Sequence, residues 1–147
     1  MVKRLVIGLC LMVLLLTACS AAAPTTGVLK DFGSVCEKAN DGKRIAAVGY
    51  LRFPDSFTGT DNVVLRFYNA SDFSGAPIGV TVNFGTQANQ VEPVQDQFND
   101  SDLKVHLTNG QAAGLGTKVK VSGDVYFPIV AQEFACGLDN PLLEGTN

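Results

Sequence analysis

The sequence predicts an all-β domain, rich in strands and with one or two short helices. Five segments alternate apolar and polar residues, so that every second side chain would face a core. The stretches between them are rich in glycine, proline, asparagine and aspartate, which favour turns. The five predicted strands cover residues 45–53, 63–68, 78–84, 103–108 and 119–127.

Residues 1–18 precede this domain and have the layout of a secretory signal peptide. Lys3 and Arg4 are followed by an apolar run over residues 5–16. The run is too short for a stable membrane span, and it lacks the polar face of a core helix. We therefore expect residues 1–18 to be removed.

The four residues Leu16-Thr17-Ala18-Cys19 follow this run and resemble the lipobox of bacterial lipoproteins. The resemblance implies diacylglyceryl transfer to the Cys19 thiol, cleavage after Ala18, and acylation, for example with palmitate, of the new amino group. Two or more acyl chains hold a protein firmly at a membrane. Residues 19–27 would then be a lipidated flexible tether on the extracytoplasmic side of the bacterial cell envelope. Ser20 replaces the aspartate of inner-membrane retention, which points to the outer membrane if one exists.

The cysteine count predicts one disulfide in the exported domain. Cys10 leaves with the signal and Cys19 takes the lipid, so Cys36 and Cys136 remain. An oxidising compartment favours their pairing. In the chain-entropy model, closing a loop of about 100 residues contributes roughly 4–5 kcal/mol. The alternatives are a reactive thiol or a metal site, but two distant cysteines with His106 as the only histidine are poor zinc ligands.

Two further segments have helical spacing. Residues 28–40 place Leu29, Phe32 and Cys36 on one face, although Gly33 lowers helix propensity. The long connection 85–102 contains Val91, Val94 and Phe98, with Pro93 in what would be the first turn of a short helix.

Five strands with a longer, helical insert between the third and fourth match the order of an OB-fold barrel. Residues 102–111 and 116–125 resemble the last two strands of that fold. Gly49 lies within the first segment, as in its bent opening strand. The chain therefore resembles exported bacterial OB-fold lipoproteins over about residues 36–136, within a domain spanning 28–147. A small immunoglobulin-like β-sandwich shares these motifs and is the alternative.

The charge balance disfavours general nucleic-acid binding. Loss of Lys3 and Arg4 with the signal leaves nine basic against fourteen acidic side chains, a net charge near −5. A general nucleic-acid binder needs net positive charge to displace phosphate counterions.

The outward strand positions nevertheless form a candidate ligand face. Carboxylates fall mostly in loops, so the barrel wall would be locally basic and aromatic, suited to stacking and charge pairing with an extended polymer. Strand propensity alone explains the same residues, and we prefer that simpler interpretation. The residues of this face are Tyr50, Arg52, Arg66, Tyr68, Lys104, His106 and Tyr126, with Lys118 and Lys120 beside them.

The remaining polar residues predict no catalytic residue, cofactor or metal. His106 has no nearby serine or cysteine to activate. Asp96, Asn99, Asp100 and Asp102 lack the glycine and terminal glutamate of an EF-hand loop. A solvated loop explains this cluster more simply.

Three functions follow from these patterns. We favour a membrane-tethered, non-catalytic binding or assembly module that holds a protein partner or a polymer at the envelope. The second is binding of an anionic polymer, single-stranded nucleic acid or acidic glycan, on the ligand face. The third, an envelope enzyme of unspecified type, would need a polar cleft with two converging titratable groups. The oligomeric state is not predicted.

Overall fold

The computed structural model describes residues 22–130 and 133–146. The predicted signal peptide and Cys19 lie outside these residues. Within them, no helix is long and apolar enough to cross a membrane.

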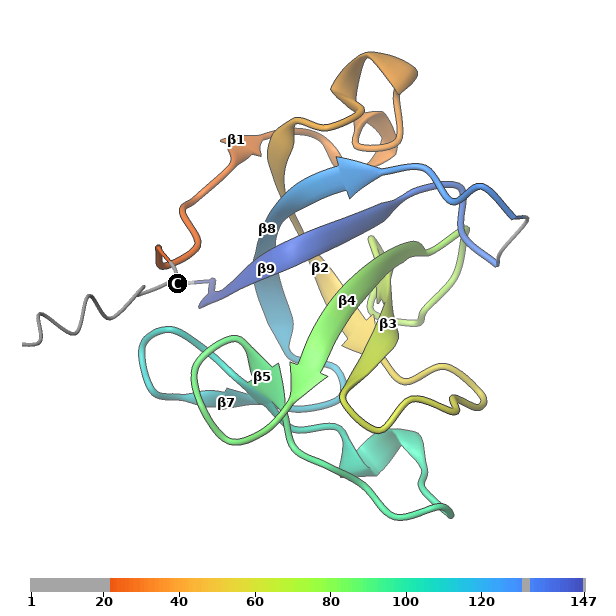
Figure 1. The fold of residues 1–147 in the computed structure, drawn as a ribbon, viewed down its shortest axis with the longest axis vertical. Helices are drawn as coiled ribbons and strands as arrows, with labels where there is room; N and C mark the ends of the chain where they lie inside the picture. The colour runs from red at the N-terminus through yellow and green to blue at the C-terminus, as the bar shows by residue number, and fades with distance from the viewer. Residues whose placement is uncertain (1–21, 131–132, 147) are drawn as a thin grey trace, which may run out of the picture.

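Five strands close into a barrel of the predicted OB-fold-like class (Figure 1). Going around it, each strand pairs with the next in the order β2, β3, β4, β9, β8 and back to β2. All pairs are antiparallel except β4 with β9. The strands are β2 (Arg44–Arg52), β3 (Asn62–Tyr68), β4 (Ile78–Phe84), β8 (Lys118–Tyr126) and β9 (Gly137–Gly145).

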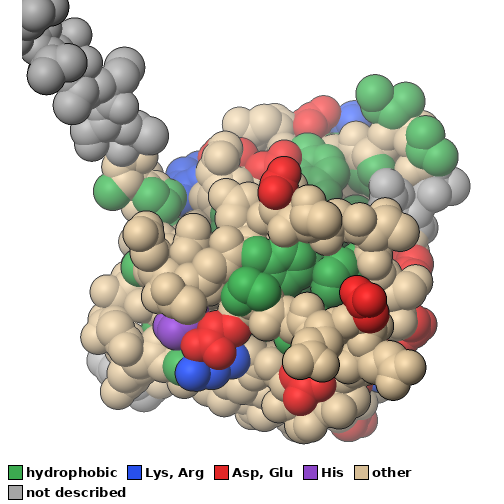
Figure 2. Space-filling view, turned by 60° about the horizontal axis from the view of Figure 1, so that its bottom comes forward, with side chains coloured by type: hydrophobic (Ala, Val, Ile, Leu, Met, Phe, Trp, Pro, Cys, Tyr) green, Lys and Arg blue, Asp and Glu red, His purple; other side chains and the backbone are tan. Residues whose placement is uncertain are grey.

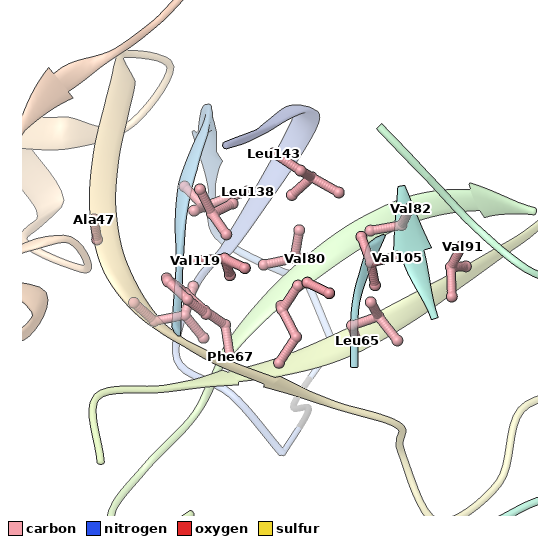
Figure 3. Close-up of a cluster of buried hydrophobic side chains, with 14 of the residues drawn as sticks. Ala47, Leu65, Phe67, Val80, Val82, Val91, Val105, Val119, Leu138 and Leu143 are labelled. Atoms are coloured by element: carbon pink, nitrogen blue, oxygen red, sulfur yellow. The ribbon is translucent and has the colours of Figure 1, made fainter. Parts of the chain in front are cut away.

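The predicted alternation places the core correctly in four of these strands. The apolar positions of β2, β3, β4 and β8 point into the barrel and meet side chains from β9 (Figure 3). Burial of these side chains is the main stabilising contribution, because each methylene removed from water adds about 0.8 kcal/mol. The fully buried set includes Phe53, Leu65, Phe67, Val80, Val119, Val121, Leu138 and Leu143.

The prediction that segment 103–108 forms a strand of the barrel is wrong. Segment 103–108 contains only the short β6 (Val105–His106) and lies in the connection between β4 and β8. The strand that closes the barrel is β9, so residues 116–125 form the fourth barrel strand and not the last.

A bulge explains why β9 shows no alternation in the sequence. Ser122 pairs with Leu142 and Asp124 with Asp139, so two residues of β9 stand opposite the single residue Gly123. The two are Asn140, which has φ of +50°, and Pro141. A bulge admits proline into a sheet because that position has no ladder hydrogen bond to donate.

The connection between β4 and β8 covers one end of the barrel. It contains β5 (Gln90–Val91), η3 (Asp100–Asp102), β6 and β7 (Ala112–Ala113), and it adds Val91, Leu103 and Val105 to the core. The helix predicted around Val91, Val94 and Phe98 is absent here, because the backbone of Val91 pairs with both β4 and β6.

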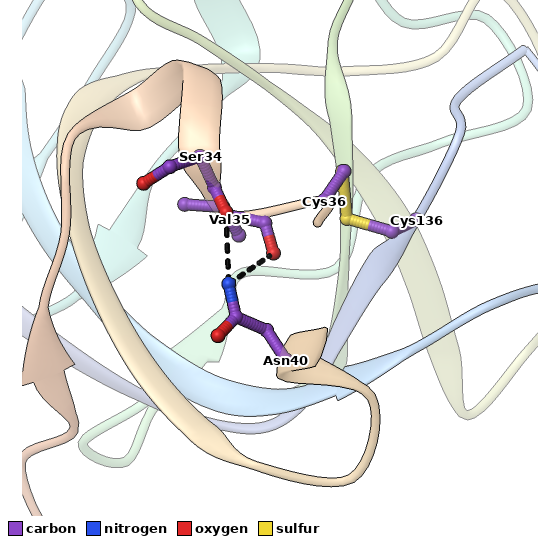
Figure 4. Close-up of a disulfide and its surroundings, with 5 residues drawn as sticks. All are labelled: Ser34, Val35, Cys36, Asn40 and Cys136. Atoms are coloured by element: carbon purple, nitrogen blue, oxygen red, sulfur yellow. Dashed lines mark hydrogen bonds between the residues drawn. A yellow bond between two sulfur atoms is a disulfide. The ribbon is translucent and has the colours of Figure 1, made fainter. Parts of the chain in front are cut away.

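The N-terminal segment covers the other end. The helix predicted over 28–40 is replaced by β1 (Val28–Leu29) and the two 3₁₀ turns η1 (Phe32–Ser34) and η2 (Lys38–Asn40). β1 pairs with β2, which holds that stretch extended. The buried Asn40 amide donates to the carbonyls of Ser34 and Val35, at 2.8 and 3.3 Å, and so joins the two turns (Figure 4).

The predicted disulfide is present. Cys36 follows η1 and bonds to Cys136 at the start of β9, with 5.4 Å between the Cα atoms (Figure 4). The bond therefore joins the covering N-terminal turns to the last barrel strand across 100 residues of chain.

Contacts with the barrel begin before the predicted domain start at residue 28. The Arg44 guanidinium donates to the Thr25 carbonyl at 2.5 Å and to the Asn140 carbonyl at 3.0 Å, and it pairs with Asp124 at 3.1 Å. Gly27 lies so close to Ile45 that a side chain would collide with its backbone. Part of the predicted tether is therefore fixed to β2.

Candidate functional site

Four residues of the predicted ligand face do share one face of the barrel. Tyr50 lies directly opposite Tyr68, and Arg52 lies opposite Arg66, on the paired strands β2 and β3. Directly opposed residues, and residues two apart in a strand, point to the same side of a sheet.

The other three lie elsewhere. Lys104 and His106 both contact one oxygen of Glu92, at 2.7 and 3.0 Å, beside β5 and β6. Tyr126 lies at the end of β8, where its ring packs directly on Gly137. Burial of this ring raises the pKa of the Tyr126 hydroxyl. The predicted continuous face is therefore divided among separate places.

Three basic residues of the predicted face, Arg52, Arg66 and Lys104, are each paired with a carboxylate. Besides the two groups on Glu92, the Arg52 Nε lies 2.6 Å from Asp100. The Arg66 guanidinium binds both oxygens of Asp55, at 2.9 and 3.0 Å, and its Nε lies 2.6 Å from Glu133. These ion pairs cancel most of the local positive charge that the outward pattern predicts.

Two positions expected to face solvent, Arg66 and Tyr68, are buried, with 8% and 7% exposure. Asp55 and Glu133 hold Arg66 from two loops. Phe73, in the β3–β4 loop with φ of +59°, packs its ring edge-on against Tyr68 at 5.6 Å between centroids. Residues of three loops, Asp55, Phe73 and Glu133, therefore cover this part of the face.

The ion pairs keep their members charged. Hydrogen bonds from Arg66 hold the pKa of the Asp55 carboxyl below its ordinary value, and the Asp55 carboxylate in turn raises the pKa of Arg66. Hydrogen bonding from Lys104 likewise lowers the pKa of Glu92.

Arg66 also joins the β2–β3 loop, residues 53–61, to the β8–β9 loop, residues 127–136. A hollow of about 640 Å³ lies beside this junction. Its wall combines the charged pair of Arg66 and Glu133 with the apolar Phe57 and Phe134.

A second hollow, of about 540 Å³, adjoins the first and shares its wall of Phe57, Thr58 and Gly59. Its floor is aromatic: the Phe57 ring centroid lies 4.9 Å from that of Phe98 and 5.4 Å from that of Phe84. The fully buried Phe53 packs against Phe98 at 5.1 Å and supports this floor from the core.

A third hollow, of about 370 Å³, continues from the second through the shared residues Pro93, Val94 and Gln95. It ends at Glu92 and Asp102. We call these three adjoining hollows, lined by residues from 54–60, 92–98 and 133–134 with neighbouring strand residues, the loop groove. Other hollows lie beside η1 and beside Arg44.

Acidic groups surround the loop groove. Figure 2 shows an apolar area on this end of the molecule with separate acidic side chains around it. Asp96 and Asp102 line the groove, Asp61 follows the lining residue Thr60, and all three are exposed. Together with the net single negative charge of Arg66 with its two carboxylates, this gives the groove an acidic border.

The acidic loop that lines part of the groove is shaped by its own hydrogen bonds. The Asn99 side chain accepts from the Ser101 amide at 3.0 Å, and Asp102 accepts from the Asn99 amide at 2.9 Å, which caps η3. Within residues 22–130 and 133–146, no cluster of three or more histidine, cysteine or acidic side chains is arranged to hold a metal ion.

Sequence reasoning missed the groove itself. Phe57, an aromatic residue between Ser56 and Thr58 in a turn-rich loop, was a usable signal. Glu133 carried no such signal in the sequence, because its pairing with Arg66 depends on the closure of the barrel by β9.

Comparisons of the chain with protein-family models, with curated proteins and with solved structures give no match. The function therefore has to be argued from the geometry of the site.

Proposed function

We propose that the protein is a membrane-tethered, non-catalytic binding module of the bacterial cell envelope, and that its binding surface for a protein partner is the loop groove. The observation that carries this proposal is that three hollows adjoin one another, with Phe57 in the wall shared by the first two and residues 93–95 in the wall shared by the second and third. Hollows with apolar, aromatic walls and a few polar groups are typical of binding sites. Loops held by a rigid scaffold commonly supply them.

The charged groups of the groove suit binding better than proton transfer. A general acid or base works best when its pKa lies near the working pH. The pKa values of Asp55 and Glu92 are shifted down, away from neutrality, and that of Arg66 is shifted up. All three are therefore fixed charges that can orient a ligand.

The lipid anchor would keep this module close to its membrane. Cys19 precedes Thr25 by six residues, and Arg44 holds the Thr25 carbonyl. Six extended residues span at most about 20 Å. The barrel would therefore act on partners in or near the same membrane.

Site-specific photo-crosslinking tests the binding surface. In cells that produce the full-length chain, a photo-reactive amino acid replaces Thr58 or Gln95, two exposed groove residues, or Lys43, an exposed control outside the groove. We expect a discrete protein adduct from the two groove positions but not from Lys43. Phe57→Ala should remove the adduct formed at Gln95, since it deletes the shared wall.

Adducts of equal yield at all three positions, or adducts that persist in the Phe57→Ala variant, would contradict the proposal. Circular dichroism of the variant provides the control for folding.

Binding of an anionic polymer on the β2–β3 face is the second candidate. The shared face of Tyr50, Arg52, Arg66 and Tyr68 supports it, whereas the ion pairs of both arginines weigh against it. It predicts salt-sensitive binding of single-stranded nucleic acid or acidic glycan that weakens in the Tyr50→Ala variant. Binding that changes neither with salt concentration nor with the Tyr50→Ala substitution would rule out this second candidate.

A further inference from the structure

We infer that the loop groove binds an extended polypeptide segment in which basic side chains flank one apolar side chain. This inference rests on the proposed function and adds the chemistry of the partner. Three features of the groove carry it: its elongation, its aromatic centre and its charge.

The elongation favours a chain-like ligand. The first hollow adjoins the second through Phe57, Thr58 and Gly59, and the second adjoins the third through residues 93–95. The second hollow is therefore the middle one of a row of three. A compact small molecule would fill one hollow, whereas an extended peptide can occupy all three.

The centre favours an apolar side chain. The rings of Phe57, Phe84 and Phe98 are all partly exposed and lie 4.9 to 5.4 Å apart where they contact. At this spacing the rings touch one another, so they form a platform and not a cage around a cation. An aromatic or branched aliphatic side chain placed on this platform would bury the remaining ring surface.

The border favours basic neighbours for that side chain. Arg66 with Asp55 and Glu133 leaves one negative charge at one end of the groove. Asp61, Asp96 and Asp102 add three more along its length. Two further ion pairs add no net charge, because each joins one cation to one carboxylate: Arg52 with Asp100, and Lys104 with Glu92. This excess repels polyanions and attracts lysine and arginine side chains.

Short synthetic peptides test this chemistry. The full-length lipidated chain is placed in zwitterionic phosphatidylcholine nanodiscs, with empty nanodiscs as the blank. Fluorescently labelled peptides carry a central phenylalanine between lysines, the same phenylalanine between glutamates, or a central alanine between lysines. We expect anisotropy to show binding of the first peptide only, weakening as salt is raised.

Matched variants locate the site. Neutralising two border carboxylates in Asp61→Asn/Asp96→Asn should weaken binding of the first peptide about threefold to tenfold, as expected for exposed charge pairs. Thr58→Arg should abolish binding by placing a cation in the shared wall. Asp41→Asn, an exposed carboxylate in the turn after η2, should bind like the unmodified chain.

The outcomes separate this inference from the proposed function. Equal binding of the lysine and glutamate peptides, or unchanged binding by the double variant, overturns the peptide chemistry. If crosslinked adducts still form at Thr58 in that case, the binding module stands and only its partner chemistry fails. If neither adduct nor peptide binding is found, both proposals fail.

Discussion

Arg66 connects segments that are distant in the sequence. Its side chain is only 10% exposed, yet both of its carboxylate partners, Asp55 and Glu133, are largely exposed. The bidentate contact with Asp55 gives the geometry that only a guanidinium provides. One buried arginine thus fixes the β2–β3 loop and the β8–β9 loop relative to each other at one end of the groove.

The Asp55 contact makes part of the stability depend on pH. The folded-state pKa of Asp55 lies below its ordinary value near 3.9. The contribution of Asp55 to the free energy of unfolding is therefore complete above about pH 4. It is lost as the pH falls through the lower folded-state pKa. In urea titrations between pH 6 and pH 2, Asp55→Asn should lose less stability on acidification than the unmodified chain. Identical pH dependence in the two proteins would show that this pair contributes nothing.

Gly49 allows β2 and β3 to approach closely. A Cβ at this position would lie 2.2 Å from the Tyr68 carbonyl oxygen and 2.9 Å from the Phe67 ring. We expect Gly49→Ala to lower the free energy of unfolding by about 1–3 kcal/mol, as overpacking does. Gly33→Ala is the matched control, because a Cβ there meets nothing within 4 Å and should change stability by less than about 0.5 kcal/mol. Urea denaturation of both variants measures the difference.

Among the elements, the start of β9 is fixed through the preceding residue Cys136 by two kinds of bond. Gly79 donates its amide to the Cys136 carbonyl at 3.1 Å, and Cys136 is covalently bonded to Cys36 after η1. Phe134, which leads into β9, fills the space above Gly79. The position of Cys136 therefore links three parts of the structure. These are the covering turns, the parallel β4–β9 pair and the wall of the groove that contains Phe134.

The disulfide should contribute a large part of the stability. Cys36→Ser/Cys136→Ser is expected to lower the free energy of unfolding by about 2–5 kcal/mol, since the loop it closes is long. The unmodified chain under reducing conditions should unfold at the same urea concentration as the double variant. A reduced chain as stable as the oxidised one would contradict this expectation.

For the whole molecule, the contacts that hold Thr25 and the residues that line the groove lie on different segments of the chain. Thr25 is held beside Arg44 and the bulge of β9, whereas the groove is built from the β2–β3 loop, the β8–β9 loop and the connection after β4. If Cys19 carries the proposed lipid, the contacts that hold Thr25 would therefore not occupy the groove.

The anchor itself is tested at Cys19. Cys19→Ser should abolish incorporation of labelled palmitate and move the protein out of the membrane fraction, because the thiol that takes the lipid is gone. Cys10→Ser, within the expected signal peptide, is the matched control and should behave like the unmodified chain. Membrane association of the Cys19→Ser variant equal to that of the control would rule out the lipid anchor.

Local sequence patterns were enough to predict the barrel class, four of its five strands and the disulfide. These follow from local patterns: alternation places Leu65 and Val80 inward, and the expectation of export led to the pairing of the two remaining cysteines. Three features became visible only in the folded chain: β9 closes the barrel, Asp55 and Glu133 neutralise Arg66, and Phe57, Phe84 and Phe98 meet in one groove. The physical reason is that a bulge hides the period of β9, and that contacts between loops depend on which strands close the sheet, which no local pattern encodes.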